Sequence, residues 1–306
     1  MAETEITKKE LQTLKAITLT DPETIKELAQ TISTSLSYTS TTLKRLQEKG
    51  FINKRRNSKE KKPQIADTHH AATLRALILD SPNLNLDVLA NKGTIILATI
   101  ACQNLRTAKE LQEASGASYG TLWRFVDAAR GMGLIQKNDT ITINSTYSRV
   151  TQLVESYQRY IHQKEALKHA DDANVKWGCR CEYIFETTKT LDLQATGASA
   201  FRDYGALFLT PRNLYTNTRE KLRLEDHLIN HVLSEGRQNT LPLLVAWKLN
   251  ADSIDTEYLN RKAYRLKASE VTDAAQRYIE TRGREKPDYL LNWAEFTDKL
   301  REYSHE

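Results

Sequence analysis

The residues whose chemistry is easiest to interpret are the basic side chains concentrated in residues 44–62. This window holds nine Lys or Arg residues and two acidic ones, so its local charge of +7 exceeds the +5 of the whole chain. Clustered cations neutralise nucleic-acid phosphates, whereas the plainer alternative is a solvated basic surface. We expect phosphate or minor-groove contacts from Lys54, Arg55, Arg56, Lys59, Lys61 and Lys62.

The segment at the start of this window supplies side chains suited to base edges. Thr39, Leu43 and Leu46 recur at helical spacing, which predicts a helix over residues 37–49 with one packed face. Hydroxyl, phenol and guanidinium groups on the other face can hydrogen-bond base edges in the major groove. We expect this face to contact DNA through Ser37, Tyr38, Ser40, Thr41, Lys44 and Arg45.

The neighbouring segments predict the scaffold that must position this helix. Apolar spacing predicts helices over residues 8–19 and 21–32, the second starting at Asp21-Pro22. Gly50 is expected to end the helix over residues 37–49. Residues 51–67 are expected to form a strand, a charged hairpin tip and a return strand, followed by a closing helix over residues 69–80.

This order of elements resembles the winged helix-turn-helix of archaeal-type, MarR- and ArsR-like transcription regulators. The run Leu-Lys-Arg-Leu-Gln-Glu-Lys-Gly-Phe-Ile at positions 43–52 is similar to the end of the recognition helix in those proteins. The resemblance implies that residues 37–49 enter the major groove of double-stranded DNA and that the basic hairpin is the wing.

A second copy of the same organisation is predicted downstream. Helices are expected over residues 89–101, 106–114 and 119–131, and Gly133 repeats the position of Gly50, followed by a short hairpin whose cation is Lys137. Since this hairpin carries little charge, the second copy serves either DNA contact or packing and dimerisation. Its candidate DNA face consists of Ser118, Tyr119, Thr121 and Arg124.

Residues 145–170 are predicted to form one long helix. Apolar side chains on it alternate at spacings of three and four, the pattern of a helical seam. Two alternatives follow: the helix packs on its own domain, or it joins two copies into a homodimer. The seam consists of Tyr147, Val150, Val154, Tyr157 and Ile161.

The last part of the chain, residues 171–306, predicts a small α/β unit with a helical tail. Strands are expected over residues 175–185 and 205–210, a short helix between them, and mainly helices after residue 222. Residues 196–205 and 224–231 resemble the C-terminal region of some archaeal winged-helix regulators. They also resemble, more distantly, the nucleotidyltransferase-like domain of abortive-infection type IV antitoxins.

We predict no catalytic site in this part. A nucleotidyltransferase needs Gly-Ser followed by two carboxylates that hold metal ions, whereas Ala198 separates Gly197 from Ser199 and Gly205 stands where a second acid should follow Asp203. His227 and His231 share a helix face, and Cys179 and Cys181 are expected on one strand face, so the four could bind one metal ion. A structural role for these residues is favoured, and we expect no metal and no cofactor.

Composition bounds the remaining possibilities. Apolar residues make up 40% and charged residues 27%, as in ordinary globular proteins. No run of about 18 apolar residues predicts a membrane span, and the acidic start argues against a secretory signal. Three cysteines, which cannot all pair, favour a reducing cytoplasm.

We therefore predict a mainly α protein with small β-wings, in which tandem winged helix-turn-helix domains precede a small α/β domain with a helical tail. The expected domains are 1–82, 83–170 and 171–306, the last binding a regulatory ligand or a protein partner. The predicted function is a DNA-binding transcriptional regulator, not an enzyme. Alternatives are the antitoxin of a toxin–antitoxin pair and a chromosome-organising or scaffold protein.

Overall fold

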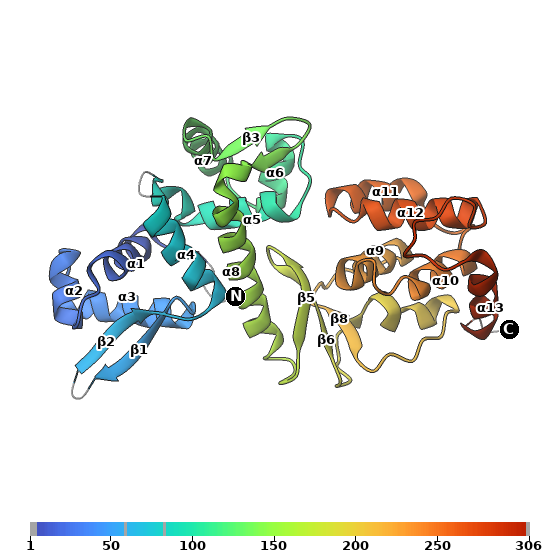
Figure 1. Ribbon diagram of the computed structural model, residues 1–306, viewed down its shortest axis with the longest axis horizontal. Coiled ribbons are helices and arrows are strands. Elements are labelled where there is room, and N and C mark those ends of the chain that lie inside the picture. Colours follow the sequence, from blue (N-terminus) through green and yellow to red (C-terminus); the bar gives the residue numbers. More distant parts are fainter. Residues whose placement is uncertain (1–4, 58–59, 82–83, 304–306) are drawn as a thin grey trace. The chain divides into compact units, whose positions relative to one another are not determined.

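The protein is mainly helical with small antiparallel sheets, as its computed structural model shows for residues 5–57, 60–81 and 84–303 (Figure 1). Contacts within this described part divide the chain into two compact units, Met1–Ile161 and His162–Glu306. No helix in the described part is long and apolar enough to cross a membrane.

Unit 1 begins with helices α1 (Lys8–Thr20), α2 (Ile25–Thr31) and α3 (Leu36–Glu48), followed by the antiparallel strands β1 (Ile52–Asn57) and β2 (Glu60–Ile65). Side-chain caps set the helix starts: the hydroxyls of Thr7, Thr24 and Ser35 each accept a backbone N–H of the first turn. The predicted start of α2 at Asp21-Pro22 is wrong, because Asp21 adopts φ +44° as the C-cap of α1.

The rest of unit 1 repeats this order of elements. After α4 (His69–Asp80) and a short 3-10 turn, helices α5 (Lys92–Cys102), α6 (Ala108–Ser115) and α7 (Tyr119–Gly131) lead into strands β3 (Ile135–Lys137) and β4 (Ile141–Ile143). Gly50 and Gly133 follow α3 and α7 with φ values of +74° and +67°. A Cβ atom at Gly50 would also lie 2.4 Å from Cζ of Tyr160, so any other residue there would be strained at this φ and would have to displace the Tyr160 ring.

Helix α8 (Ser148–Ala166) supplies a seam to the core of unit 1. Val150, Val154 and Tyr157 are at most 2% exposed, Ile161 is buried as well, and Tyr147 is half-buried against the same core. The structure therefore gives the alternative in which the helix packs on its own unit. Four of these five side chains are buried within unit 1, so they do not form the surface that a homodimer seam would need.

A buried ion pair joins the beginning of α1 to the end of α3. Lys49 Nζ lies 2.8 Å from both carboxylate oxygens of Glu10 and also donates to the Glu5 carbonyl. Both residues are at most 5% exposed. The Glu10 carboxylate additionally accepts the Thr7 backbone N–H at 2.7 Å, which completes the capping box of α1. The Glu10 carboxylate thus stabilises the start of α1 and connects it to the end of α3.

Helix α4 closes over this pair through His70. The His70 Nε2–H donates to the Lys49 carbonyl (3.0 Å), and the ring contacts Phe51 edge-on with centroids 4.6 Å apart. Burial lowers the pKa of His70 to about 4, although the hydrogen bond to Lys49 opposes that shift. The imidazole is therefore neutral in the folded protein at neutral pH.

Within the described part, the sheet of unit 2 has the strand order β5-β6-β8-β7, with every neighbouring pair antiparallel. Its strands are β5 (Asn174–Cys179), β6 (Glu182–Thr187), β7 (Gln194–Ala195) and β8 (Asn213–Thr216). The prediction of one strand over residues 175–185 is wrong, because a turn with Arg180 at φ +58° folds the segment into a hairpin. Cys179 and Cys181 consequently do not share a strand face.

The helical remainder of unit 2 packs around one apolar core. Two 3-10 turns, Gly197–Ser199 and Phe201–Tyr204, occupy the predicted short helix, and the strand expected over residues 205–210 is not formed. The helices are α9 (Leu224–Glu235), α10 (Leu241–Leu249), α11 (Thr256–Arg265), α12 (Ser269–Glu280) and α13 (Trp293–Tyr303). The largest buried side chains that join them include Phe201, Tyr278 and Phe296.

Removing one partner of the buried pair should destabilise unit 1 strongly. Glu10→Gln leaves the Lys49 ammonium without its counter-charge in a buried site, at an expected cost of about 3–5 kcal/mol in the free energy of unfolding. Urea denaturation measures this quantity. As a control, Lys299→Gln removes a partly exposed pair with Glu302 and should cost about 1 kcal/mol or less. Equal effects of the two changes would contradict the structural role of the buried pair.

His70 should make folding stability depend on pH in a defined window. The unfolded imidazole takes up a proton near pH 6.5, whereas the folded one does so only near its pKa of about 4. The contribution of neutral His70 to the free energy of unfolding is therefore fully present above pH 6.5. It decreases as the pH drops toward 4, by up to about 1.4 kcal/mol per pH unit for one proton. Urea titrations at several pH values in this window should show that the free energy of unfolding of His70→Gln depends less steeply on pH than that of the parent protein. An unchanged pH dependence would contradict the role given to His70.

Candidate nucleic-acid interface

Helix α3 presents two faces of different chemistry. Thr39, Thr42, Leu43 and Leu46 are buried toward the unit 1 core. The opposite face carries the predicted base-contacting residues, and all of them are exposed: Ser37, Tyr38, Ser40, Thr41, Lys44 and Arg45. Tyr38 is 48% exposed although it is a large aromatic residue. The structure thus brings these six together on one accessible helix face.

The hairpin beside α3 holds the predicted phosphate-contacting residues at its strand positions. In the β1–β2 register Lys54 stands opposite Pro63, Arg55 opposite Lys62, and Arg56 opposite Lys61. For Lys54, Arg55, Arg56 and Lys61 the structure gives the backbone position alone, and Lys59 lies outside the described residues. Four cationic positions therefore belong to a hairpin that packs next to α3 (Figure 1).

Lys62 does not have the role predicted for it. Its residue is only 7% exposed, and its ammonium binds the carboxylates of Glu23 (2.6 Å) and Asp21 (3.0 Å). Hydrogen bonds to Glu23 and Asp21 raise the pKa of Lys62, so it stays charged and paired within the chain. Lys62 connects β2 to the segment between α1 and α2. We therefore no longer expect it to contact phosphates.

Among the basic residues of the window 44–62 whose side chains the structure describes, two are thus neutralised inside the protein. Lys49 is paired with Glu10, and Lys62 with Asp21 and Glu23. The sequence window contains neither Glu10 nor Asp21, because both acids come from segments earlier in the chain. A local charge count cannot find such partners, and it overstates the positive charge that this surface exposes.

The second copy presents an exposed aromatic face on α7. Ser118 caps the helix, accepting the Thr121 N–H at 3.4 Å, and Tyr119 is 70% exposed. Arg124 is exposed too, with its Nε donating to the Gly120 carbonyl at 3.1 Å. The sequence prediction missed Trp123, which is 60% exposed one turn after Tyr119. Trp123 follows Tyr119 by four residues, and this helical spacing alone could have placed the two side chains on the same face.

The histidine pair of unit 2 is buried and hydrogen-bonded. Thr196 Oγ1 lies 3.2 Å from His227 Nδ1, and His231 Nε2 donates to the Asn239 carbonyl at 2.6 Å. Burial lowers the pKa of His227 to about 4. In the part of the chain that the structure describes, no group of three or more His, Cys, Asp or Glu side chains is arranged to hold a metal ion. These contacts give both histidines a structural role.

Comparison with known proteins finds a family match at the start of the chain. Residues 5–68 match a protein family described as HVO_A0114. This segment runs from the capping box of α1 to the end of the β1–β2 hairpin and covers less than half of the chain. The chain matches no curated protein and no solved structure. The matched segment coincides with the elements that carry the α3 face and the basic hairpin.

Proposed function

We propose that unit 1 is a winged helix-turn-helix module that binds double-stranded DNA, and that the protein regulates transcription through it. The observation that carries this proposal is the exposed α3 face of hydroxyl, phenol and cationic groups beside a hairpin with four further cationic positions. An exposed helix of this length fits the major groove, and a basic hairpin next to it suits the flanking backbone.

The two surfaces have different tasks in this mechanism. Arg45 and Tyr38 can hydrogen-bond base edges, so the α3 face supplies discrimination between sequences. The hairpin cations release counterions from the phosphates and supply affinity for any duplex. The paired Lys62 contributes to neither task directly; it holds the hairpin against the segment between α1 and α2.

The α7 face is left with the two roles predicted for it. Tyr119 and Trp123 offer aromatic surface, but the adjacent hairpin β3–β4 carries Lys137 as its basic residue. A surface with little charge binds DNA weakly at physiological salt. DNA contact through this face would therefore require that the first module binds the DNA backbone as well. A protein partner could bind the face without the first module.

Neutralising the hairpin should weaken binding to every duplex. The triple variant Arg55→Gln, Arg56→Gln, Lys61→Gln should reduce the slope of log affinity against log salt by about 0.9 for each phosphate that the protein no longer neutralises. Fluorescence anisotropy with a labelled duplex at several salt concentrations measures this slope.

A matched control removes the same charge elsewhere. Arg261→Gln, Arg284→Gln and Arg301→Gln neutralise three exposed cations of unit 2, and together they should leave the salt slope close to that of the parent. If the control variant lowers the slope as much as the hairpin variant, net charge rather than the hairpin governs binding.

Changing the α3 face should instead erode discrimination. Tyr38→Ala and Arg45→Ala should each cost roughly 1–3 kcal/mol on the preferred sequence and much less on other duplexes. Selection of bound sequences from a random duplex pool, followed by affinity measurement, tests this, with Lys9→Ala on α1 as the control. A uniform loss over all duplexes would rule out base contact by α3, and a pool without enrichment would favour the chromosome-organising alternative.

A further inference from the structure

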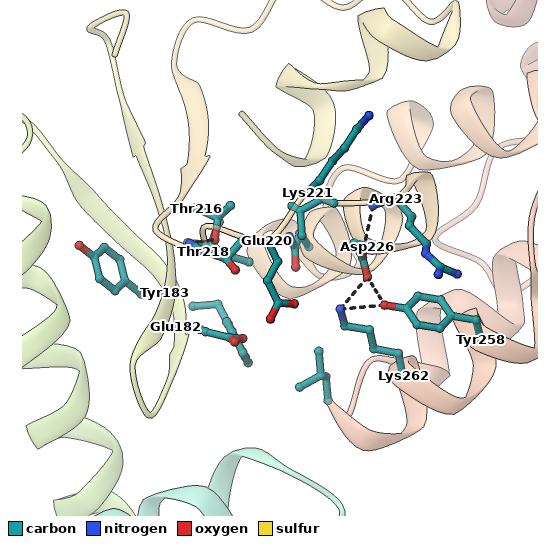
Figure 2. A pocket seen from close by; sticks show the side chains of 15 residues that line it. Glu182, Tyr183, Thr216, Thr218, Glu220, Lys221, Arg223, Asp226, Tyr258 and Lys262 are labelled. Atoms are coloured by element: carbon teal, nitrogen blue, oxygen red, sulfur yellow. Dashed lines mark hydrogen bonds and ion pairs between the residues drawn. The ribbon is translucent and has the colours of Figure 1, made fainter. Parts of the chain in front are cut away.

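Unit 2 contains a cavity that the proposed DNA contacts do not use. Its volume is about 300 Å³, at the lower end of the range for small-molecule sites. Strands β6 and β8 and the loop of residues 217–223 line one side, and α9 and α11 line the other (Figure 2). The cavity lies entirely within unit 2, so its chemistry can be considered by itself.

A buried carboxylate organises the helical side. Asp226 on α9 is 4% exposed and receives three donors: the Lys262 ammonium (2.6 Å), the Tyr258 hydroxyl (2.7 Å) and the Arg223 backbone N–H (2.8 Å). Burial opposes its ionisation, but these donors outweigh burial and keep the pKa of Asp226 below its usual value. Asp226 therefore has three hydrogen-bond donors of its own within unit 2, and it fixes Lys262 and Tyr258 at the cavity wall.

Lys262 retains capacity for a ligand. Its ammonium has three N–H groups, of which one points to Asp226 and a second to the Tyr258 oxygen at 3.2 Å. Its side chain is 33% exposed. One N–H of a preorganised cation therefore remains available to an anionic group in the cavity.

The opposite side of the cavity carries two acidic residues. Glu182 and Glu220 line it, and within the described structure neither carboxylate has a hydrogen bond or ion pair. In Figure 2 the Glu220 side chain reaches into the cavity toward Lys262, with no ion pair drawn between them. Opposite charges thus face one another across open space.

The loop that carries Glu220 is held in place. The Gln194 amide lies between the Glu220 carbonyl (2.8 Å) and the Leu222 N–H (2.9 Å), and in the orientation that satisfies both groups it donates to the first and accepts from the second. Asn217 bridges the neighbouring hairpin, accepting the Tyr183 N–H at 2.8 Å and donating to the Cys181 carbonyl at 2.7 Å. The charges on the two sides are therefore presented by a preformed wall, which limits the entropic cost of binding.

From this arrangement we propose that the cavity binds a free α-amino acid, with its ammonium group on Glu220 and Glu182 and its carboxylate on Lys262. A diamine would satisfy the two acids but would place a second cation against Lys262. A dicarboxylate would meet the reverse conflict at Glu220, because the other two cations of the lining, Lys221 and Arg223, extend away from Glu220 in Figure 2. A zwitterion satisfies both ends, and the apolar surface of Trp177 and Leu266 in the lining receives its side chain. The assignment does not depend on whether unit 1 binds DNA.

Isothermal titration calorimetry of the full chain with each of the twenty common L-amino acids tests the proposal. At least one should bind with one site per chain. Two analogues of the amino acid that binds are then compared with it: the amine without the carboxylate group, and the carboxylic acid without the amino group. Each analogue should bind at least about tenfold more weakly, since each loses a charge-assisted hydrogen bond. If either analogue binds as tightly as the amino acid, the cavity is a simple cation site or anion site, and the proposal fails. Absence of binding by all twenty also overturns it.

Two variants locate the site. Glu220→Gln, on an exposed loop, and Lys262→Gln should each weaken binding of the selected amino acid roughly 10- to 100-fold. Glu257→Gln, on the exposed side of α11 and outside the cavity, is the matched control and should bind as the parent does. If Lys262→Gln fails to fold because Asp226 loses its partner, Glu220→Gln alone decides. Unchanged binding by Glu220→Gln would place the amino acid elsewhere and refute the assignment.

Discussion

The pairing of Glu10 with Lys49 is the interaction on which the arrangement of unit 1 most depends. Two buried charges are costly to desolvate, and they are stable only where geometry is good and their remaining hydrogen bonds are made. Here the Glu10 carboxylate also caps α1, and the Lys49 carbonyl accepts a hydrogen bond from His70 on α4. Helices α1, α3 and α4 are therefore fixed against each other at one point, and the orientation of the exposed α3 face follows from that constraint.

The same device recurs at the other two surfaces. Lys62 ties the β1–β2 hairpin to Asp21 and Glu23, and Lys262 ties α11 to Asp226 on α9. In each case a lysine ammonium meets a carboxylate that comes from a distant segment of the chain. These pairs set geometry, and the residues left outside them, such as Arg45 on α3 or Glu220 on its loop, remain able to meet a ligand.

Much of the secondary structure could be predicted, because amphipathic spacing and capping residues are local properties. The bounds predicted for α4 and α7 are those observed, and α3 differs by one residue at each end. The failures arose where the local sequence is compatible with more than one conformation. Residues 175–185 have aromatic and β-branched residues at both ends, but Arg180 in a left-handed turn folds the segment into a hairpin. The start of α2 was misplaced because Asp21-Pro22 is a plausible cap, whereas the observed cap is Thr24.

The sequence by itself determined which helix faces are polar, where glycines end α3 and α7, and that cations crowd one hairpin, because these follow from residue type and periodicity. It could not decide which cations are free. Lys49 and Lys62 look like their neighbours in the window 44–62, and only folding brings Glu10, Asp21 and Glu23 to them. The α8 seam was likewise ambiguous until packing buried it in unit 1. The basic stretch thus became one exposed helix face and one hairpin, held in place by two lysines whose charges are paired within unit 1.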